Sequence, residues 1–168
     1  MVGPPMHSLS RRAVLAAIGL TLVLHTIEEY VTFPEFLSSS DGGLAKWLHP
    51  NKFLHNSHEL RIALVIATVL PLAVIAWAIL RPRKGWLISA LLLESILLVN
   101  AAWHILAAIV RHGYAPGVVT AVLVNLPFGV YVLRRAINEQ WIAAPTAALL
   151  IGIALVLHVV ALGSLLAG

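Results

Sequence analysis

The chain has 168 residues, of which 60% are hydrophobic and 11% are charged. Soluble domains are about 45–50% apolar and about 25% charged, so this composition, with a mean hydropathy of +0.94, excludes a water-soluble globular domain. The sequence contains no cysteine, which excludes disulfides, thiolate-bound zinc and cysteine nucleophiles. The 11 Lys and Arg residues occur in short clusters between apolar runs. This pattern is typical of membrane topology, so we expect the lipid bilayer, and no nucleic acid, as a partner.

Five apolar stretches are long enough to cross a membrane as helices, which takes roughly 20 residues. They cover residues 13–32, 62–80, 86–110, 117–133 and 141–167. Segments of alternating polarity are absent, so a β-barrel is excluded. The sequence therefore predicts an all-α fold, a polytopic transmembrane helix bundle that forms one membrane-embedded domain over residues 1–168. The segment 33–60 is expected to be a loop followed by an interfacial stretch, long enough to act as a lid.

The distribution of basic residues gives the expected orientation. Seven of them fall on one side of the five predicted spans: Arg11, Arg12, Arg81, Arg83, Lys84, Arg134 and Arg135. Because cytoplasmic loops carry an excess of Lys and Arg, we expect a cytoplasmic N-terminus and an external C-terminus. The protein is thus expected to be a multi-pass integral membrane protein.

The first predicted span carries an unusual group of ionisable residues. His25, Glu28 and Glu29 lie within five positions of one another, although a charge at the bilayer centre costs about 2.5–3.5 kcal/mol or more. At about 100° per residue, all three side chains occupy one arc of about 100° on the helix. This spacing can direct three ligands to one point.

Further polar groups occur at a similar level on other predicted spans. His55, His58 and Glu59 repeat the spacing of the first cluster just before the second span, and which of the two histidines is the closer donor stays open. Asn100 and His104 share one face of the third span, because four residues separate them. His158 lies at this level on the fifth span. Glu94, on the third span, lies about 15 Å from His104 along the helix, and its role stays open.

These groups favour a metal site. Two adjacent carboxylates repel each other, and the first, third and fifth spans contain no Lys or Arg to pair with them. A divalent cation would keep both acids ionised, whereas a carboxylate pair sharing a proton and polar helix packing are the alternatives. The predicted metal ligands are His25, Glu28, Glu29, His55, His58, Glu59 and His104. Asn100 and His158 are predicted to support them.

Three motifs give the chain a resemblance to a known family. His25-x-x-Glu28-Glu29, together with the elements His55-x-x-x-Glu59 and Asn100-x-x-x-His104, resembles the HXXEE family of bacterial integral membrane proteins. The similarity extends over essentially the whole chain. It implies that the protein lies in a bacterial cytoplasmic membrane and that these seven residues belong to the functional set. It supplies no reaction.

The donor set defines the expected chemistry. Imidazole and carboxylate without sulfur suit iron, manganese or zinc, and six or seven donors exceed the three or four that one zinc ion takes. The sequence therefore predicts a membrane-embedded enzyme with two metal ions. The favoured type is a non-haem iron oxidoreductase that acts on a hydrophobic or lipid-like substrate. Glu28 and Glu29 are its candidate catalytic residues. The alternatives are an intramembrane hydrolase, zinc-dependent or of the glutamate type, and a non-enzymatic metal-binding or transport protein.

Overall fold

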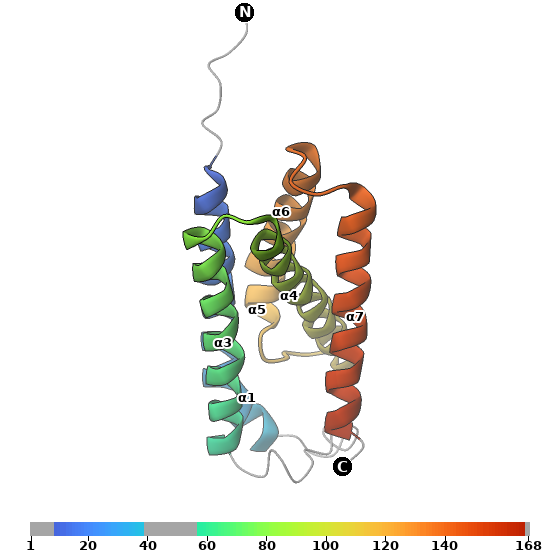
Figure 1. Cartoon of the computed structure of the whole chain (residues 1–168). Coiled ribbons are helices and arrows are strands. Elements are labelled where there is room, and N and C mark those ends of the chain that lie inside the picture. Colours follow the sequence, from blue (N-terminus) through green and yellow to red (C-terminus); the bar gives the residue numbers. More distant parts are fainter. Residues whose placement is uncertain (1–8, 39–56, 167–168) are drawn as a thin grey trace, which may run out of the picture.

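The structure is a computed structural model that describes residues 9–38 and 57–166, and these residues fold almost entirely into helices (Figure 1). The elements in chain order are α1 (Arg11–Ser38), α3 (Ser57–Leu80), α4 (Lys84–Arg111), α5 (Val118–Thr120), the π-helical turn η1 (Ala121–Asn125), α6 (Leu126–Asn138) and α7 (Ala144–Leu166). No strand occurs in these ranges. The predicted all-α class is thereby confirmed.

Within the described part of the chain, five helical segments are long and apolar enough to cross a membrane. They are Arg11–Phe36, Arg61–Leu80, Lys84–Arg111, Val118–Asn138 and Ala144–Ala161. These segments indicate a multi-pass integral membrane protein and confirm the predicted transmembrane bundle. The orientation of the N-terminus stays a prediction.

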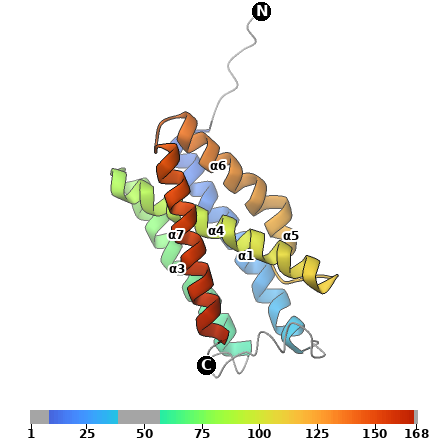
Figure 2. The same cartoon turned by 90° about the vertical axis from the view of Figure 1, so that its right-hand side faces the viewer.

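Four of the helices pack in two pairs, and the fourth span, Val118–Asn138, contacts both pairs. α1 lies along α3, and α4 packs against α7 (Figure 1). In the turned view, α4 crosses the bundle obliquely, and α5 and α6 form its other flank (Figure 2). The start of α1, the α3–α4 turn and the α6–α7 turn lie together at one end of the bundle, the top of Figure 1. We call this end the basic end, because Arg11, Arg83 and Lys84 lie there.

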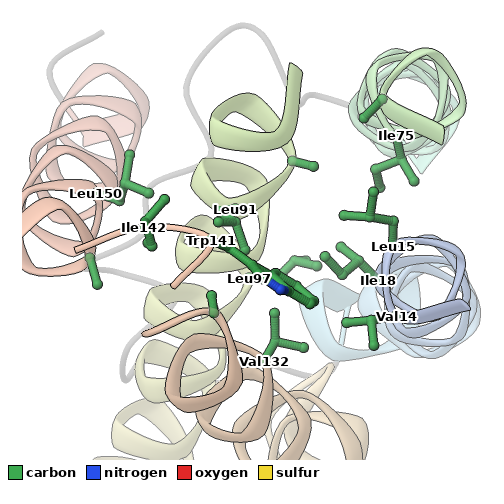
Figure 3. Packing of buried hydrophobic residues seen from close by; sticks show 14 of the residues in the cluster. Val14, Leu15, Ile18, Ile75, Leu91, Leu97, Val132, Trp141, Ile142 and Leu150 are labelled. Atoms are coloured by element: carbon green, nitrogen blue, oxygen red, sulfur yellow. The ribbon is translucent and has the colours of Figure 1, made fainter. Parts of the chain in front are cut away.

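The buried apolar core lies toward the basic end. Val14 and Ile18 of α1, Leu91 of α4, Val132 of α6 and Trp141 of the α6–α7 turn converge there (Figure 3). Lipid tails are as apolar as these side chains, so close van der Waals packing, and not removal from water, stabilises the core. The helices differ in how much of them is buried. In the most apolar stretch of each span, 39% of the residues of α1 are buried but only 11% of those of α3. α3 is therefore the least buried of the five crossings.

The C-terminal part of α1 differs from the sequence expectation. Residues 33–38 were expected to begin a loop, but α1 continues through Pro34 to Ser38. Proline inside a helix removes one backbone hydrogen bond, and the residues that follow Pro34 contact a distant helix. The Arg111 guanidinium of α4 lies 4.2 Å from the centre of the Phe36 ring, and Phe33 packs edge-to-face on Phe36. Residues 39–56 of the expected loop, including His55, lie outside the described residues.

The fourth span contains an irregular turn next to the site. α5, η1 and α6 follow one another without a break from Val118 to Asn138. The π-helical turn Ala121–Asn125 interrupts the α-helical hydrogen bonding, and such turns occur frequently at functional sites. The run begins after Gly117, whose φ is +80°. This left-handed conformation, which glycine adopts without strain, brings the first turn of the run against α1.

Candidate metal centre

Three ligand-bearing side chains meet between α1 and α4. One ligand atom from each of His25, Glu29 and His104 lies within 4.8 Å of the other two. The Glu29 Oε1 atom is 3.1 Å from Nε2 of His104 and 3.6 Å from Nε2 of His25. His25 and Glu29 are one helical turn apart on α1, so both face α4. Two of the predicted crossings thus contribute to one group of donors.

This group of donors is shielded from the surroundings. His25 is 2% exposed and His104 is 7% exposed, while the Glu29 side chain is 13% exposed. The two imidazole rings pack edge-to-face with their centroids 4.9 Å apart. A carboxylate in such a place needs a compensating positive charge. Among the described residues, no Lys or Arg forms an ion pair with Glu29.

Asn100 joins the two histidines. Its Nδ2 atom lies 2.8 Å from Nε2 of His25 and 3.0 Å from Nε2 of His104. An amide NH₂ group has two protons to donate, so Asn100 can serve both nitrogens at once. The two Nε2 atoms then accept the Asn100 protons, and both lie next to the Glu29 carboxylate.

Glu28 lies beside this group but has other partners. Its carboxylate accepts hydrogen bonds from the backbone N–H groups of Val119 (3.1 Å) and Thr120 (2.7 Å), from the Thr120 hydroxyl (2.6 Å) and from the Tyr114 hydroxyl (2.9 Å). These amides belong to the first turn of the fourth span, where backbone N–H groups lack partners within the helix. Partial burial raises the pKa of the Tyr114 phenol, so it keeps the proton that it donates. Four donors hold Glu28 in its ionised form.

Thr120 connects Glu28 to His25. The Thr120 hydroxyl has one proton, which goes to the carboxylate at 2.6 Å in preference to the Gly117 carbonyl at 3.2 Å. Its oxygen therefore accepts the Nδ1–H of His25, which is 2.8 Å away. This chain of bonds fixes the His25 tautomer and leaves its Nε2 unprotonated. Metal-binding histidines are oriented in the same way by a hydrogen bond from their second nitrogen.

Gly117 makes room for both imidazole rings. A Cβ atom at this position would lie 2.7 Å from Cε1 of His25 and 3.1 Å from Cε1 of His104. The φ of +80° also disfavours any side chain there. Gly117 therefore lets the loop between α4 and α5 close over the two rings.

The other predicted site residues have different placements. His58 lies in the first turn of α3, where its side chain is exposed, and it is not one of the three grouped donors. His55 and the Glu59 side chain lie outside the described residues. His158 packs near Trp103, with the ring centroids 6.0 Å apart. The roles of these residues as ligands or supports stay predictions.

Glu94 occupies a separate position in the bundle. It is 1% exposed, and its Oε1 would lie 3.0 Å from a Cβ placed on Gly129. Among the described residues, its other oxygen has no hydrogen-bond partner. Glu94 does not belong to the group of three donors.

Three contributors were missed in the sequence: Tyr114, Gly117 and Thr120. Gly117 follows Pro116, and this dipeptide indicates a turn. It gives no information on which helix the turn contacts. Thr120 is the only Ser or Thr residue in the apolar run 117–133, and this is its one distinguishing feature. Neither feature predicts a contact with residues about 90 positions earlier in the chain.

Thr120 provides a test of the connection between Glu28 and His25. Thr120→Val keeps the side-chain shape but removes the hydroxyl, so His25 loses the acceptor that fixes its tautomer. We expect affinity for Zn²⁺ or Fe²⁺ to fall about 10–100-fold, the usual effect of losing such a partner. Competition titration with a chromogenic chelator measures it, with Thr146→Val on α7 as a control. Equal affinity of Thr120→Val and the unaltered protein would contradict the proposed role of this hydroxyl.

Comparison with known proteins agrees with the motifs. Residues 16–132 match the family described as proteins of unknown function with an HXXEE motif. Neither the curated proteins nor the solved structures give a significant match. The matched region covers more than half of the chain and contains His25, Glu29 and His104. The chain therefore belongs to the HXXEE family of proteins.

Proposed function

We propose that His25, Glu29 and His104 bind one divalent metal ion within the membrane-spanning part of the bundle. The observation that supports this is the meeting of one carboxylate oxygen and two imidazole nitrogens within 4.8 Å. The hydrogen bond from His25 Nδ1 to Thr120 leaves Nε2 of His25 without a proton, and the Asn100 amide donates to both Nε2 atoms. A cation among the three side chains would balance the charge of the Glu29 carboxylate and would take the place of the Asn100 protons on the two nitrogens.

The donor set favours iron(II) as the ion. Two histidines and one carboxylate, with the remaining positions open, are the ligands of non-haem Fe(II) oxygenases. The same set also occurs in zinc hydrolases. In this proposal Glu29 is a ligand, and Glu28 orients His25 through Thr120. A second ion would need donors such as His55 and Glu59, so the two-ion centre stays a separate prediction.

The surroundings of the centre favour a hydrophobic substrate. The donors lie within the spans Arg11–Phe36 and Lys84–Arg111, and large apolar side chains nearby are exposed, among them Leu24, Ile27 and Leu106. A substrate that reaches the centre from the bilayer must therefore be lipid-like. We propose hydroxylation of a C–H bond in such a substrate.

The reaction needs dioxygen and an external electron donor. One oxygen atom enters the C–H bond, and the other leaves as water after two electrons and two protons arrive from that donor. Bound iron would supply the activation of dioxygen. The buried position of His25 and His104 limits access of water to the donors, which suppresses side reactions.

Metal analysis of the purified protein tests this proposal. The protein is purified in detergent without chelators, its metals are quantified by mass spectrometry, and oxygen uptake is followed with a reductant and extracted lipids. One equivalent of iron with lipid-dependent oxygen uptake supports the proposal, and two equivalents would support the two-ion centre. Zinc at one equivalent would favour the hydrolase. Protein that neither retains nor takes up iron, zinc or manganese would refute the metal centre.

A further inference from the structure

A cavity of about 230 Å³ opens at the basic end of the bundle. The first turn of α1, the α3–α4 turn and the α6–α7 turn enclose it. Six of its lining residues carry polar or aromatic groups: Arg11, Arg12, Arg83, Lys84, Gln140 and Trp141. The other lining residues are aliphatic. The cavity is distant from the candidate metal centre, because Arg11 and His25 are 14 residues, or about 21 Å, apart along α1.

The charge around this cavity is positive and lacks a counter-charge. Four of its lining residues are cationic, and among the described residues no carboxylate lines it. Arg12, Arg83 and Lys84 form no ion pair with any described residue. Cations gathered around one space repel one another, and a bound anion removes that repulsion.

The nearest acid is already engaged. Glu139 accepts a hydrogen bond of 2.7 Å from Nε of Arg135 and one of 3.1 Å from the Trp141 indole. The hydrogen bond from Arg135 lowers the pKa of Glu139, and the nearby charge of Arg11 adds to the effect. Arg135 thus neutralises Glu139, and Arg12, Arg83 and Lys84 have no carboxylate partner among the described residues.

The position of the cavity indicates a membrane ligand. Arg11, Arg83 and Lys84 lie at the boundaries of apolar spans, which is where phospholipid headgroups meet the hydrocarbon layer. Trp141 lies on the same wall, with the Arg11 guanidinium 4.9 Å from its ring centre, and indoles favour this level of the bilayer. The aliphatic part of the wall suits the start of an acyl chain.

We propose that this cavity binds the phosphate group of an anionic phospholipid. The planar forks of Arg12 and Arg83 match the geometry of phosphate oxygens, and Lys84 adds a third uncompensated charge. No side chain caps the first turn of α4, so its backbone amides can also donate to the anion. Basic pockets between membrane helices bind lipid headgroups in this manner. The phosphate of a lipid, and not free phosphate, is the expected ligand.

A charge-matched pair of variants tests the proposal. Arg12→Gln/Arg83→Gln removes two cations from the cavity, while Arg81→Gln/Arg134→Gln removes two from outside it at the same end. Each protein is titrated in neutral detergent with short-chain phosphatidylglycerol or phosphatidylcholine, and bound lipid is counted by native mass spectrometry. We expect the unaltered protein to prefer phosphatidylglycerol about tenfold or more, because each Lys or Arg near a headgroup contributes roughly a fivefold gain.

The outcomes separate a defined site from general surface charge. The cavity variant should lose the preference, and the outer variant should keep it within about twofold. Equal losses in both variants, or no preference in the unaltered protein, would overturn the proposal. Displacement of the lipid by inorganic phosphate at equal concentration would show that free phosphate is the ligand, which also overturns it. Unchanged helical circular dichroism in both variants shows that each one folds.

Discussion

Replacing His104 by alanine is expected to reduce bound metal from about one equivalent per chain to less than about a tenth. His104 supplies the ligand atom nearest to Glu29, at 3.1 Å, and α4 offers no other imidazole to replace it. Only two of the three grouped donors remain after this change, which is too few to hold an ion against competing water. Plasma mass spectrometry of the purified variant, loaded anaerobically with Fe²⁺, measures the loss.

The control for this experiment is a histidine at the C-terminal end of α4, the helix that carries His104. His112 follows α4, is exposed and has a φ of 53°. His112→Asn preserves that conformation, which asparagine tolerates, and should retain the full equivalent of metal. If His104→Ala and His112→Asn hold the same amount of metal while both are folded, the proposed centre does not exist. His58→Ala in the same series shows whether the first turn of α3 contributes a ligand.

Gly117→Ala should damage both the site and the stability of the protein. The added methyl group would lie 2.7 Å from Cε1 of His25, so the ring or the loop must move. Alanine at a φ of +80° adds strain of about 1–2 kcal/mol. We expect at least about a tenfold loss of metal affinity, since ligands displaced by a fraction of an ångström bind poorly, and a fall in melting temperature measured by circular dichroism in detergent.

Gly113→Ala is the matched control in the same loop. A Cβ atom there would meet only the Arg111 carbonyl oxygen, at 3.9 Å, which is an ordinary contact distance. This variant should keep the metal affinity and melting temperature of the unaltered protein. Similar behaviour of the two alanine variants would mean that Gly117 does not set the space around the imidazoles.

The sequence predicted the bundle and the convergence of α1 and α4 because both follow from short-range rules. Apolar runs of about 20 residues indicate spans, and the structure contains five helices of this kind. A spacing of four residues places His25 with Glu29, and Asn100 with His104, on one helix face. The high free-energy cost of polar groups in the bilayer makes a shared location of these faces the expected solution.

The remaining features depend on contacts that local patterns do not specify. Glu28 is adjacent to Glu29, but its partners lie on a segment about 90 residues away, where Thr120 has no motif around it. Helix α1 continues beyond Pro34, and Phe36 in this extension packs against Arg111 of α4, a contact that the sequence around Pro34 does not predict. In both cases tertiary structure decides what the neighbouring sequence leaves open.

The separation of the donors along the chain fixes when the site can form during biosynthesis. His25 and Glu29 enter the bilayer with the first helix, whereas His104, Gly117 and Thr120 are translated about 75–95 residues later. Until then the ribosome-bound nascent chain holds a membrane-embedded acid without its imidazole partner from α4. The proposed ion would therefore bind only at a late stage of assembly, after the fourth crossing has been made.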